Sequence, residues 1–342
     1  MGLDIELIRE TERDEWDSCV VKSPQTTFFH RYDALQSVAD YFDAALYPLI
    51  GYRGQEPVGI LPLFELGKGP FTIIASPPPH LEVNIGPALL NYDKVKQRKK
   101  EKRHREFVDG CLDFIEGNFD TNYVDLKTAT RYNDVRQFIR RGYDVGVSYT
   151  YVLDLTPSEE ELLGRFSRDA RSNITNVNAD EYVTERGSAE EIPAIVNLVQ
   201  RRFDEQDLYY WLNSELAVDL YTTSSSEYVR PYVCRVDGKI VGGILALEHG
   251  DTMYRWQSGS RLDVDIPVTE LLDWHVIQDA RERDLKCYDL VGAMEQSLCD
   301  YKSKFAPDPV PVYTMERKGI VASVAEQAYS RMSNMFRDIV GL

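Results

Sequence analysis

The residues best suited to chemistry gather near the end of the chain, in residues 285–305, LKCYDLVGAMEQSLCDYKSKF. A short strand that contains Asp289 stops at a glycine, and a helical stretch follows that carries Tyr301, Lys302 and Lys304. A strand that stops at a glycine leaves backbone donors at a cleft, and a lysine just beyond it can meet an anion or a developing oxyanion. The pattern indicates a site that polarises a carbonyl group or holds a phosphate.

Acyl transfer to an amine, which a family resemblance of this chain implies, would use these side chains directly. The reaction needs a neutral amine, a polarised carbonyl and a leaving group that can take a proton. Lys302 is the predicted source of positive charge at the oxyanion or at a substrate phosphate, and Asp289 is predicted to accept a proton or to orient the amine. The structural alternative is that Lys302 and Lys304 solvate a helix while Asp289 caps a turn.

Other side chains are predicted to hold the substrates. Arg171 could clamp a phosphate or carboxylate in bidentate fashion, or pair with one of the abundant acidic side chains. Tyr254 and Trp256 lie on one predicted strand, where an acceptor channel and ordinary core packing fit equally well. Tyr210 and Trp211 are predicted to form a lid or an apolar wall. The predicted substrate-binding residues are Arg171, Tyr210, Trp211, Tyr254, Trp256, Tyr301 and Lys304.

Other catalytic motifs are absent from the sequence. The five histidines have neither the spacing of a metal site nor that of a catalytic triad. HExxH, GxSxG, P-loop and GxGxxG motifs do not occur. We therefore predict no metal site.

The elements that must position these residues occur in a similar order in both halves of the chain. In each half, a β-rich run, a charged glycine turn and a second apolar run come first, and a strand, a helix and a further strand come later. Ordered correspondences at domain spacing indicate two copies of one α/β unit. The matching pairs are 47–61 with 232–245, 123–126 with 288–290, and 138–155 with 301–317.

A chain of 342 residues suits two domains. We predict a first domain over 1–155 and a second over 156–317, with a C-terminal helix in 318–342 packing back on the first. Periodicity predicts helices over 28–42, 131–142 and 161–177, the last with a basic face. The strands at 229–236, 240–248 and 252–259 are predicted to form an antiparallel meander.

Composition narrows the class of protein. No apolar run approaches the roughly 20 residues of a membrane span, and the charged start of the chain is unlike a signal peptide. The five cysteines are scattered without CxxC spacing, which is typical of reduced thiols in a cytoplasmic protein. The net charge of −17 disfavours nucleic-acid binding in general and is typical of acidic proteins from salt-loving organisms.

One basic run interrupts this acidity. Residues 94–106, KVKQRKKEKRHRE, hold eight Lys and Arg against two Glu. The run could dock a phosphate-bearing ligand, or it could be the solvated start of a helix that continues to residue 119. A nucleic-acid-associated protein that works through this run is disfavoured by the acidity of the rest of the chain.

A family resemblance that spans most of the chain rests on six motifs: NIGP (84–87) in the first half, and SRDARSNI (167–174), YRWQSGS (254–260), LLDW (271–274), YDLVGA (288–293) and YKSKF (301–305) in the second. With these motifs the chain resembles the FemAB/FemX family of tandem GNAT transferases. The resemblance implies two tandem GNAT-like α/β (α+β) units, each with a mixed sheet flanked by helices. It also implies an N-acyl- or aminoacyltransferase without a permanently bound cofactor, which would use acyl-CoA or aminoacyl-tRNA as donor.

The acceptor implied by the resemblance is an amine, such as one on a cell-surface glycan or peptide precursor. The sequence departs from GNAT enzymes at SGSRLDVDIPVTE (258–270), which lacks the Arg/Gln-x-x-Gly-x-Gly/Ala loop that binds the coenzyme A pyrophosphate. A catalytically degenerate tandem GNAT that binds a ligand or a protein therefore stays open as an alternative.

Overall fold

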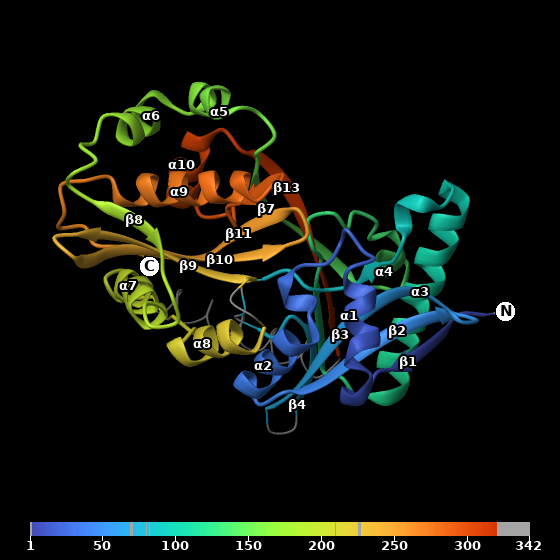
Figure 1. Ribbon diagram of the computed structural model, residues 1–342. Coiled ribbons are helices and arrows are strands. Elements are labelled where there is room, and N and C mark those ends of the chain that lie inside the picture. Colours follow the sequence, from blue (N-terminus) through green and yellow to red (C-terminus); the bar gives the residue numbers. More distant parts are fainter. Residues whose placement is uncertain are drawn as a thin grey trace, which may run out of the picture. The chain divides into compact units, whose positions relative to one another are not determined.

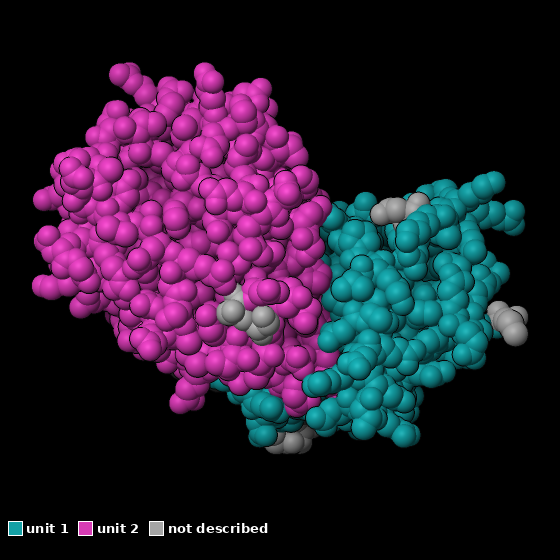
Figure 2. Space-filling model, in the orientation of Figure 1, with its two compact units in different colours: residues 1–26, 39–147, 313–342 teal, residues 27–38, 148–312 magenta. Residues whose placement is uncertain are grey.

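The protein folds into two compact units, shown in different colours in Figure 2. A computed structural model describes residues 2–68, 71–79, 81, 83–208, 210–224 and 227–319. Within these residues, unit 1 comprises 2–26, 39–147 and 313–319, and unit 2 comprises 27–38 and 148–312. The predicted boundary after residue 155 lies close to the crossing between residues 147 and 148. Residues 320–342, which hold the predicted C-terminal helix, lie outside the described residues.

Unit 1 is a mixed β-sheet with helices on its faces (Figure 1). Its first strands run antiparallel in the order β1, β2, β3, β4, and β6 then pairs with β4 in parallel. The helix α3 packs on the sheet through Phe107, whose ring occupies the space left open by Gly51 and Gly59. The elements are β1 (Asp4–Leu7), α1 (Arg13–Val20), α2 (Tyr32–Phe42, shared with unit 2), β2 (Ala45–Arg53), β3 (Glu56–Lys68), β4 (Phe71–Ser76), β5 (Ala88–Leu89), α3 (Gln97–Asn118), β6 (Tyr123–Lys127) and α4 (Arg136–Arg140).

The strands of unit 2 are mixed in direction and follow the order β7, β12, β11, β10, β9, β8. The predicted meander is confirmed: β9, β10 and β11 run antiparallel, and β12 joins β11 in parallel. The elements are β7 (Asp144–Asp154), α5 (Glu159–Arg165), α6 (Arg168–Thr175), β8 (Val183–Arg186), α7 (Ile192–Asp204), α8 (Ser214–Thr223), β9 (Val229–Val236), β10 (Lys239–His249), β11 (Thr252–Ser260), α9 (Val268–Glu282), β12 (Cys287–Asp289), α10 (Gln296–Lys302) and β13 (Asp308–Lys318).

Helices cover both faces of the unit 2 sheet (Figure 1). Two adjacent glycines of β10 show this, because neighbouring strand residues point to opposite faces. A Cβ atom at Gly242 would meet Val268 of α9, and one at Gly243 would meet Ile195 of α7. The prediction of an α/β fold with mixed sheets and flanking helices is confirmed.

The two long strands β7 and β13 are each divided between the units. Residues 148–154 of β7 belong to unit 2, where residues 152–154 pair antiparallel with β12. Residues 313–318 of β13 belong to unit 1, where they pair antiparallel with β6. Each half of the sequence therefore supplies the last strand of the other unit's sheet.

The helices differ from the periodicity-based prediction in four places. The predicted helix over 28–42 is a short 3₁₀ turn followed by α2, and the helix over 131–142 is reduced to α4. The helix over 161–177 is interrupted at Phe166, whose extended backbone buries its ring against Trp274 and Phe305. The predicted continuous basic face is therefore divided between α5 and α6. The helix α8 was not predicted.

A helix that crosses a bilayer needs about 20 predominantly apolar residues, and the helices of the described residues do not meet this requirement. None of them combines the length and the apolar character that crossing a bilayer requires.

Candidate functional site

The predicted catalytic residues meet at the end of β12 in unit 2. Asp289 is the last residue of this strand and is only 3% exposed. Its Oδ1 atom accepts hydrogen bonds from the Thr150 hydroxyl at 2.5 Å and from the backbone N–H of Val291 at 2.9 Å. The pairing of β7 with β12 brings Thr150 to this position. The carboxylate is therefore fixed in one orientation on the inside of the strand end.

The backbone turns sharply just after Asp289. Val291 and Gly292 both have positive φ, at 50° and 80°. A β-branched residue rarely adopts this conformation, which costs on the order of 1–3 kcal/mol. Lys302, itself 3% exposed, donates from Nζ to the carbonyl oxygens of Val291 at 2.6 Å and of Gly292 at 2.8 Å. The lysine thus stabilises the strained turn and places a positive charge beside it.

The expectation that this strand end would offer free backbone donors is wrong. The N–H of Val291 donates to Asp289, that of Gly292 donates to the Thr150 hydroxyl, and that of Ala293 donates to the Tyr149 carbonyl. Buried backbone donors are almost always satisfied within the protein, and here β7 supplies the acceptors. The side chain that brings positive charge to this turn is Lys302.

A second carboxylate, Asp273 of α9, organises the residues around the lysine. Asp273 is fully buried and accepts hydrogen bonds from Arg255 Nε at 2.8 Å, the Tyr288 hydroxyl at 2.6 Å and the Tyr301 hydroxyl at 2.6 Å. Burial, followed by the Asp273 charge, raises the pKa of both tyrosines well above 10. Both hydroxyls therefore remain protonated donors, and the network compensates the buried Asp273 charge.

Burial moves the pKa values of Asp289 and Lys302, the two predicted catalytic residues, towards neutral pH. Burial raises the pKa of Asp289 to about 6, against the stabilising hydrogen bonds from Thr150 and Val291. Burial, followed by repulsion from the Arg255 guanidinium, lowers the pKa of Lys302 to about 8. Shifts of this kind are concentrated at functional sites. Between these two values, Asp289 is ionised and Lys302 is protonated.

The sheet opens next to this pair. β11 and β12 are in register at only three pairs, which end with Tyr254 opposite Asp289. Beyond that point β11 continues to Ser260, paired on its other side with β10. The β10–β11 register shifts at Trp256, as in a β-bulge. The described strands therefore leave one edge of β11 open after Tyr254.

Trp256 supplies an additional polar atom at this opening. Its side chain is 5% exposed and packs edge-on against the Phe29 ring at 5.5 Å between centroids. Its indole Nε1 is buried and has no hydrogen-bond partner among the described residues. A buried indole N–H normally finds an acceptor. Among the described residues this one has none.

The remaining predicted binding residues are more dispersed. Arg171 is exposed on α6, and its guanidinium makes no hydrogen bond or ion pair within the described chain. Lys304 forms ion pairs with Asp169 at 3.0 Å and Glu270 at 3.6 Å, so its charge is already compensated. The Tyr210 hydroxyl donates to Gln257 of β11 at 2.8 Å. Tyr254 and Trp211 are both partly buried.

Sequence reasoning missed three residues of the site: Thr150, Arg255 and Asp273. Arg255 and Asp273 lie within the YRWQSGS and LLDW motifs, but nothing in the sequence indicates that they pair. Thr150 was assigned to the first domain, and it reaches Asp289 only because β7 completes the second sheet, across 139 positions of sequence. The alternating residue pattern of β7 is the one sequence feature that could have indicated this strand.

Part of the chain is similar in sequence to a known protein family. Residues 164–303 match the family model described as "Acetyltransferase (GNAT) domain". This segment of the chain is a GNAT domain. It contains β11, α9, β12 and α10, and hence Asp289, Lys302 and the open edge of β11. Among curated proteins, the sequence has no significant match.

Solved structures extend the similarity to the rest of the chain. FemX superimposes with a TM-score of 0.71 at 11% identity and covers 90% of this chain and 96% of its own. A tandem GNAT protein from the clavulanic acid biosynthesis pathway has a TM-score of 0.55 at 12% identity, with 93% and 98% covered. L-PGS from Bacillus licheniformis has a TM-score of 0.55 at 10% identity, with 93% and 96% covered. The fold of the chain is thus similar to that of FemX and of tandem GNAT proteins, as predicted.

Proposed function

We propose that the GNAT domain of unit 2 transfers an acyl group from an activated donor, either acyl-CoA or aminoacyl-tRNA, to an amine. The observation that carries the proposal is the separation of β11 from β12 at the buried pair of Asp289 and Lys302. An acceptor amine on a cell-surface glycan or peptide precursor is the proposed substrate class. No permanently bound cofactor is needed for this chemistry.

Asp289 is the proposed proton acceptor. An attacking amine must lose a proton, and a base is most effective when its pKa lies near the working pH. With a pKa of about 6, Asp289 is a stronger base than an exposed aspartate and is still ionised at pH 7. The Thr150 hydroxyl and the Val291 N–H hold it in place for this step.

Lys302 is the proposed source of electrostatic stabilisation. Its ammonium group uses two of three N–H donors on the Val291 and Gly292 carbonyls, and the third donor stays available. A cation in a site with little water stabilises a developing oxyanion, or a substrate phosphate, more strongly than it would in bulk solvent. Its positive charge is retained up to a pH of about 8.

The donor is proposed to bind along the open edge of β11. Unpaired backbone groups of a strand edge bind extended amide-containing chains, and the Trp256 indole N–H offers a further donor. Arg171, whose guanidinium is exposed, is the proposed partner of a donor phosphate or carboxylate. Tyr210, Trp211, Tyr254, Tyr301 and Lys304 remain the proposed walls of the substrate site.

One alternative function has specific support. The strand-end N–H groups are all satisfied internally, and the pyrophosphate loop of GNAT enzymes is missing from 258–270. A degenerate GNAT that binds a ligand or protein without turnover would show both features. The shifted pKa values of Asp289 and Lys302 favour the enzyme, because simple binding does not require them.

A transfer assay distinguishes the two functions. The full chain is incubated with acetyl-CoA or with mixed aminoacyl-tRNA and a panel of peptide and amino-sugar acceptors, and acylated products are detected by mass spectrometry. The enzyme predicts product formation that falls about 10²- to 10⁴-fold in Asp289→Asn, since the base is lost. Asp237→Asn, at an exposed turn of the same unit, is the control and should keep full activity. Donor binding without any product supports the degenerate alternative.

A further inference from the structure

A cleft in unit 1 gathers five cationic side chains. It lies between α3 and α4, has a volume of about 480 Å³, and is called here the α3–α4 cleft. Its cationic residues are Arg98, Lys102 and Arg105 of α3, and Arg136 and Arg140 of α4. Positive charge is unusual on a chain whose net charge is −17. The cleft lies in a different unit from the acyl-transfer site proposed above.

The three cations of α3 share one face of the helix. Arg98, Lys102 and Arg105 follow a spacing of four and then three residues, and all three side chains are exposed. Like charges at this spacing destabilise a helix. Arg98 also lies in the first turn of α3, where the helix dipole disfavours a cation, and this turn contains no acidic residue. In the absence of an anion, the arrangement therefore costs stability.

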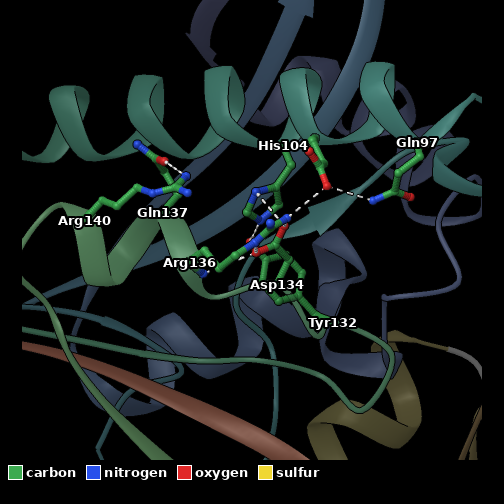
Figure 3. Close-up of polar contacts among 8 residues, drawn as sticks. Gln97, His104, Tyr132, Asp134, Arg136, Gln137 and Arg140 are labelled. Atoms are coloured by element: carbon green, nitrogen blue, oxygen red, sulfur yellow. Dashed lines mark hydrogen bonds and ion pairs between the residues drawn. The ribbon is translucent and has the colours of Figure 1, made fainter.

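Of the three cations on α3, Lys102 forms an ion pair with Glu106 at 3.6 Å, whereas the acidic residues of the α3–α4 cleft do not compensate Arg98 and Arg105. Arg136 donates to Asp134 from Nε at 2.9 Å and from one terminal nitrogen at 2.8 Å, and lies 3.4 Å from Glu101 (Figure 3). One arginine thus neutralises much of both carboxylates. Arg98 and Arg105 form no hydrogen bond or ion pair with the described residues. Two guanidinium groups thereby remain available to a ligand.

The base of the α3–α4 cleft is rigid. His104 is 3% exposed, and its Nε2 atom lies 2.6 Å from the Tyr132 hydroxyl (Figure 3). Its Nδ1 atom lies 3.7 Å from the Asp134 carboxylate, on the loop that leads into α4. Gln137 donates to Asp109 of α3 at 2.7 Å. These contacts join α4 and its preceding loop to α3, so the cationic side chains extend from a fixed frame.

A second hollow next to Arg136 enlarges the proposed site. A second hollow of about 710 Å³ shares Asp134 and Arg136 with the α3–α4 cleft and adds Lys100 and Arg131. Lys100 is held over the Tyr92 ring, with its Nζ 5.0 Å from the ring centroid. A ligand anchored in the α3–α4 cleft can therefore continue past Arg136 into a second polar, positively charged hollow.

We infer that the α3–α4 cleft binds a compact phosphate-bearing anion, such as a pyrophosphate group or a phosphomonoester. Guanidinium groups match phosphate oxygens in bidentate geometry, and a phosphate would compensate Arg98 and Arg105 together. The wall is charged and polar throughout, which disfavours an apolar ligand. A long polyanion such as RNA would extend over the acidic remainder of the chain and be repelled. The phosphate could come from a soluble nucleotide or from a phosphate-headed lipid.

Calorimetric titration of the full chain with inorganic pyrophosphate tests the inference. We expect saturable binding that weakens about tenfold or more in the double variant Arg98→Gln/Arg105→Gln, because two charge-assisted contacts are lost. The matched control is Lys94→Gln/Lys96→Gln, which removes the same charge from the same basic run outside the cleft lining. It should retain wild-type affinity within about twofold. If both variants lose pyrophosphate affinity equally, the binding depends on the general positive charge of the run and not on the cleft, and the inference is overturned.

Thermal melting shows whether each variant is folded, so that a loss of binding is not mistaken for a loss of structure. Without ligand, Arg98→Gln/Arg105→Gln should melt at or above the wild-type temperature, since like-charge repulsion is relieved. Pyrophosphate should raise the melting temperature of the wild type but not of this variant. Titration with ADP and with phosphatidic acid vesicles then separates the soluble source from the lipid source. No binding of pyrophosphate, ADP or phosphatidic acid, or binding of RNA alone, overturns the inference and leaves the proposed acyl transfer untouched.

Discussion

Asp289 holds its carboxylate where water has almost no access, and this decides its protonation behaviour. Burial raises the pKa of Asp289 to about 6, although Thr150 and Val291 donate hydrogen bonds to it. In the unfolded chain the group would titrate near 3.8. Between these pH values the folded state retains a proton that the unfolded state has lost. This carboxylate therefore lowers the free energy of unfolding as the pH rises through that interval.

The first prediction follows from this linkage. Asp289→Asn keeps an oxygen that can accept from Thr150 and Val291 but removes the titration. Relative to the wild type, the free energy of unfolding of Asp289→Asn should rise by about 1 kcal/mol between pH 5 and pH 7.5. Urea unfolding at the two pH values measures the difference. Asp237→Asn should show no such change, and a constant difference for Asp289→Asn would contradict the raised pKa.

Individual site residues could be predicted only where one segment contains them. Lys302 and Asp289 were found because a strand, a glycine and a polar helix follow each other within 285–305. The hydrogen-bond network around Asp273 could not be predicted, because its donors come from three separate elements. The role of Lys302 in supporting the left-handed turn at Val291 depends on backbone angles that no residue pattern encodes.

At the scale of elements, the unit 2 sheet depends on close contact between β10 and its covering helix. A Cβ at Gly243 would lie 2.5 Å from Ile195 of α7 and 3.1 Å from the Tyr232 carbonyl oxygen. Gly243→Ala should therefore lower the free energy of unfolding by about 1–3 kcal/mol through overpacking.

The matched control for this substitution is Gly164→Ala in α5. No atom lies within 4 Å of a Cβ at Gly164, so the change should raise stability by about 0.5–1 kcal/mol through helix propensity. Chemical denaturation of both variants compares the two effects. Equal stability of the two variants would contradict the packing of α7 on β10.

Strands were more predictable than helices in this chain. The meander over β9, β10 and β11 was recognisable because glycine turns separate strongly apolar runs. The helix expected over 131–142 is short because Tyr132 is buried and Asp134 accepts from the Arg136 backbone, which starts α4 late. The sequence pattern could not predict that β7 pairs with β12 of unit 2 and β13 with β6 of unit 1. The alternation of residues in each strand fits either pairing equally well.

The whole molecule carries a net charge of −17, and its acidity should govern its response to salt. Self-repulsion destabilises a compact state, and salt screens it: the Debye length falls from about 10 Å at 0.1 M to about 3 Å at 1 M. We predict that the melting temperature rises steadily from 0.1 M to 2 M KCl. Differential scanning calorimetry measures it, and a melting temperature independent of KCl would contradict the halophilic interpretation.

The central claim is that the GNAT domain binds an activated acyl donor at the open edge of β11. Titration calorimetry with acetyl-CoA and with a non-hydrolysable aminoacyl-tRNA tests it most directly, using the wild type, Trp256→Phe and the control Trp274→Phe. We predict that one donor binds, and that Trp256→Phe raises its Kd by roughly fivefold to tenfold through the lost indole N–H, while Trp274→Phe does not. Absence of binding by both donors to the wild-type chain would contradict the claim.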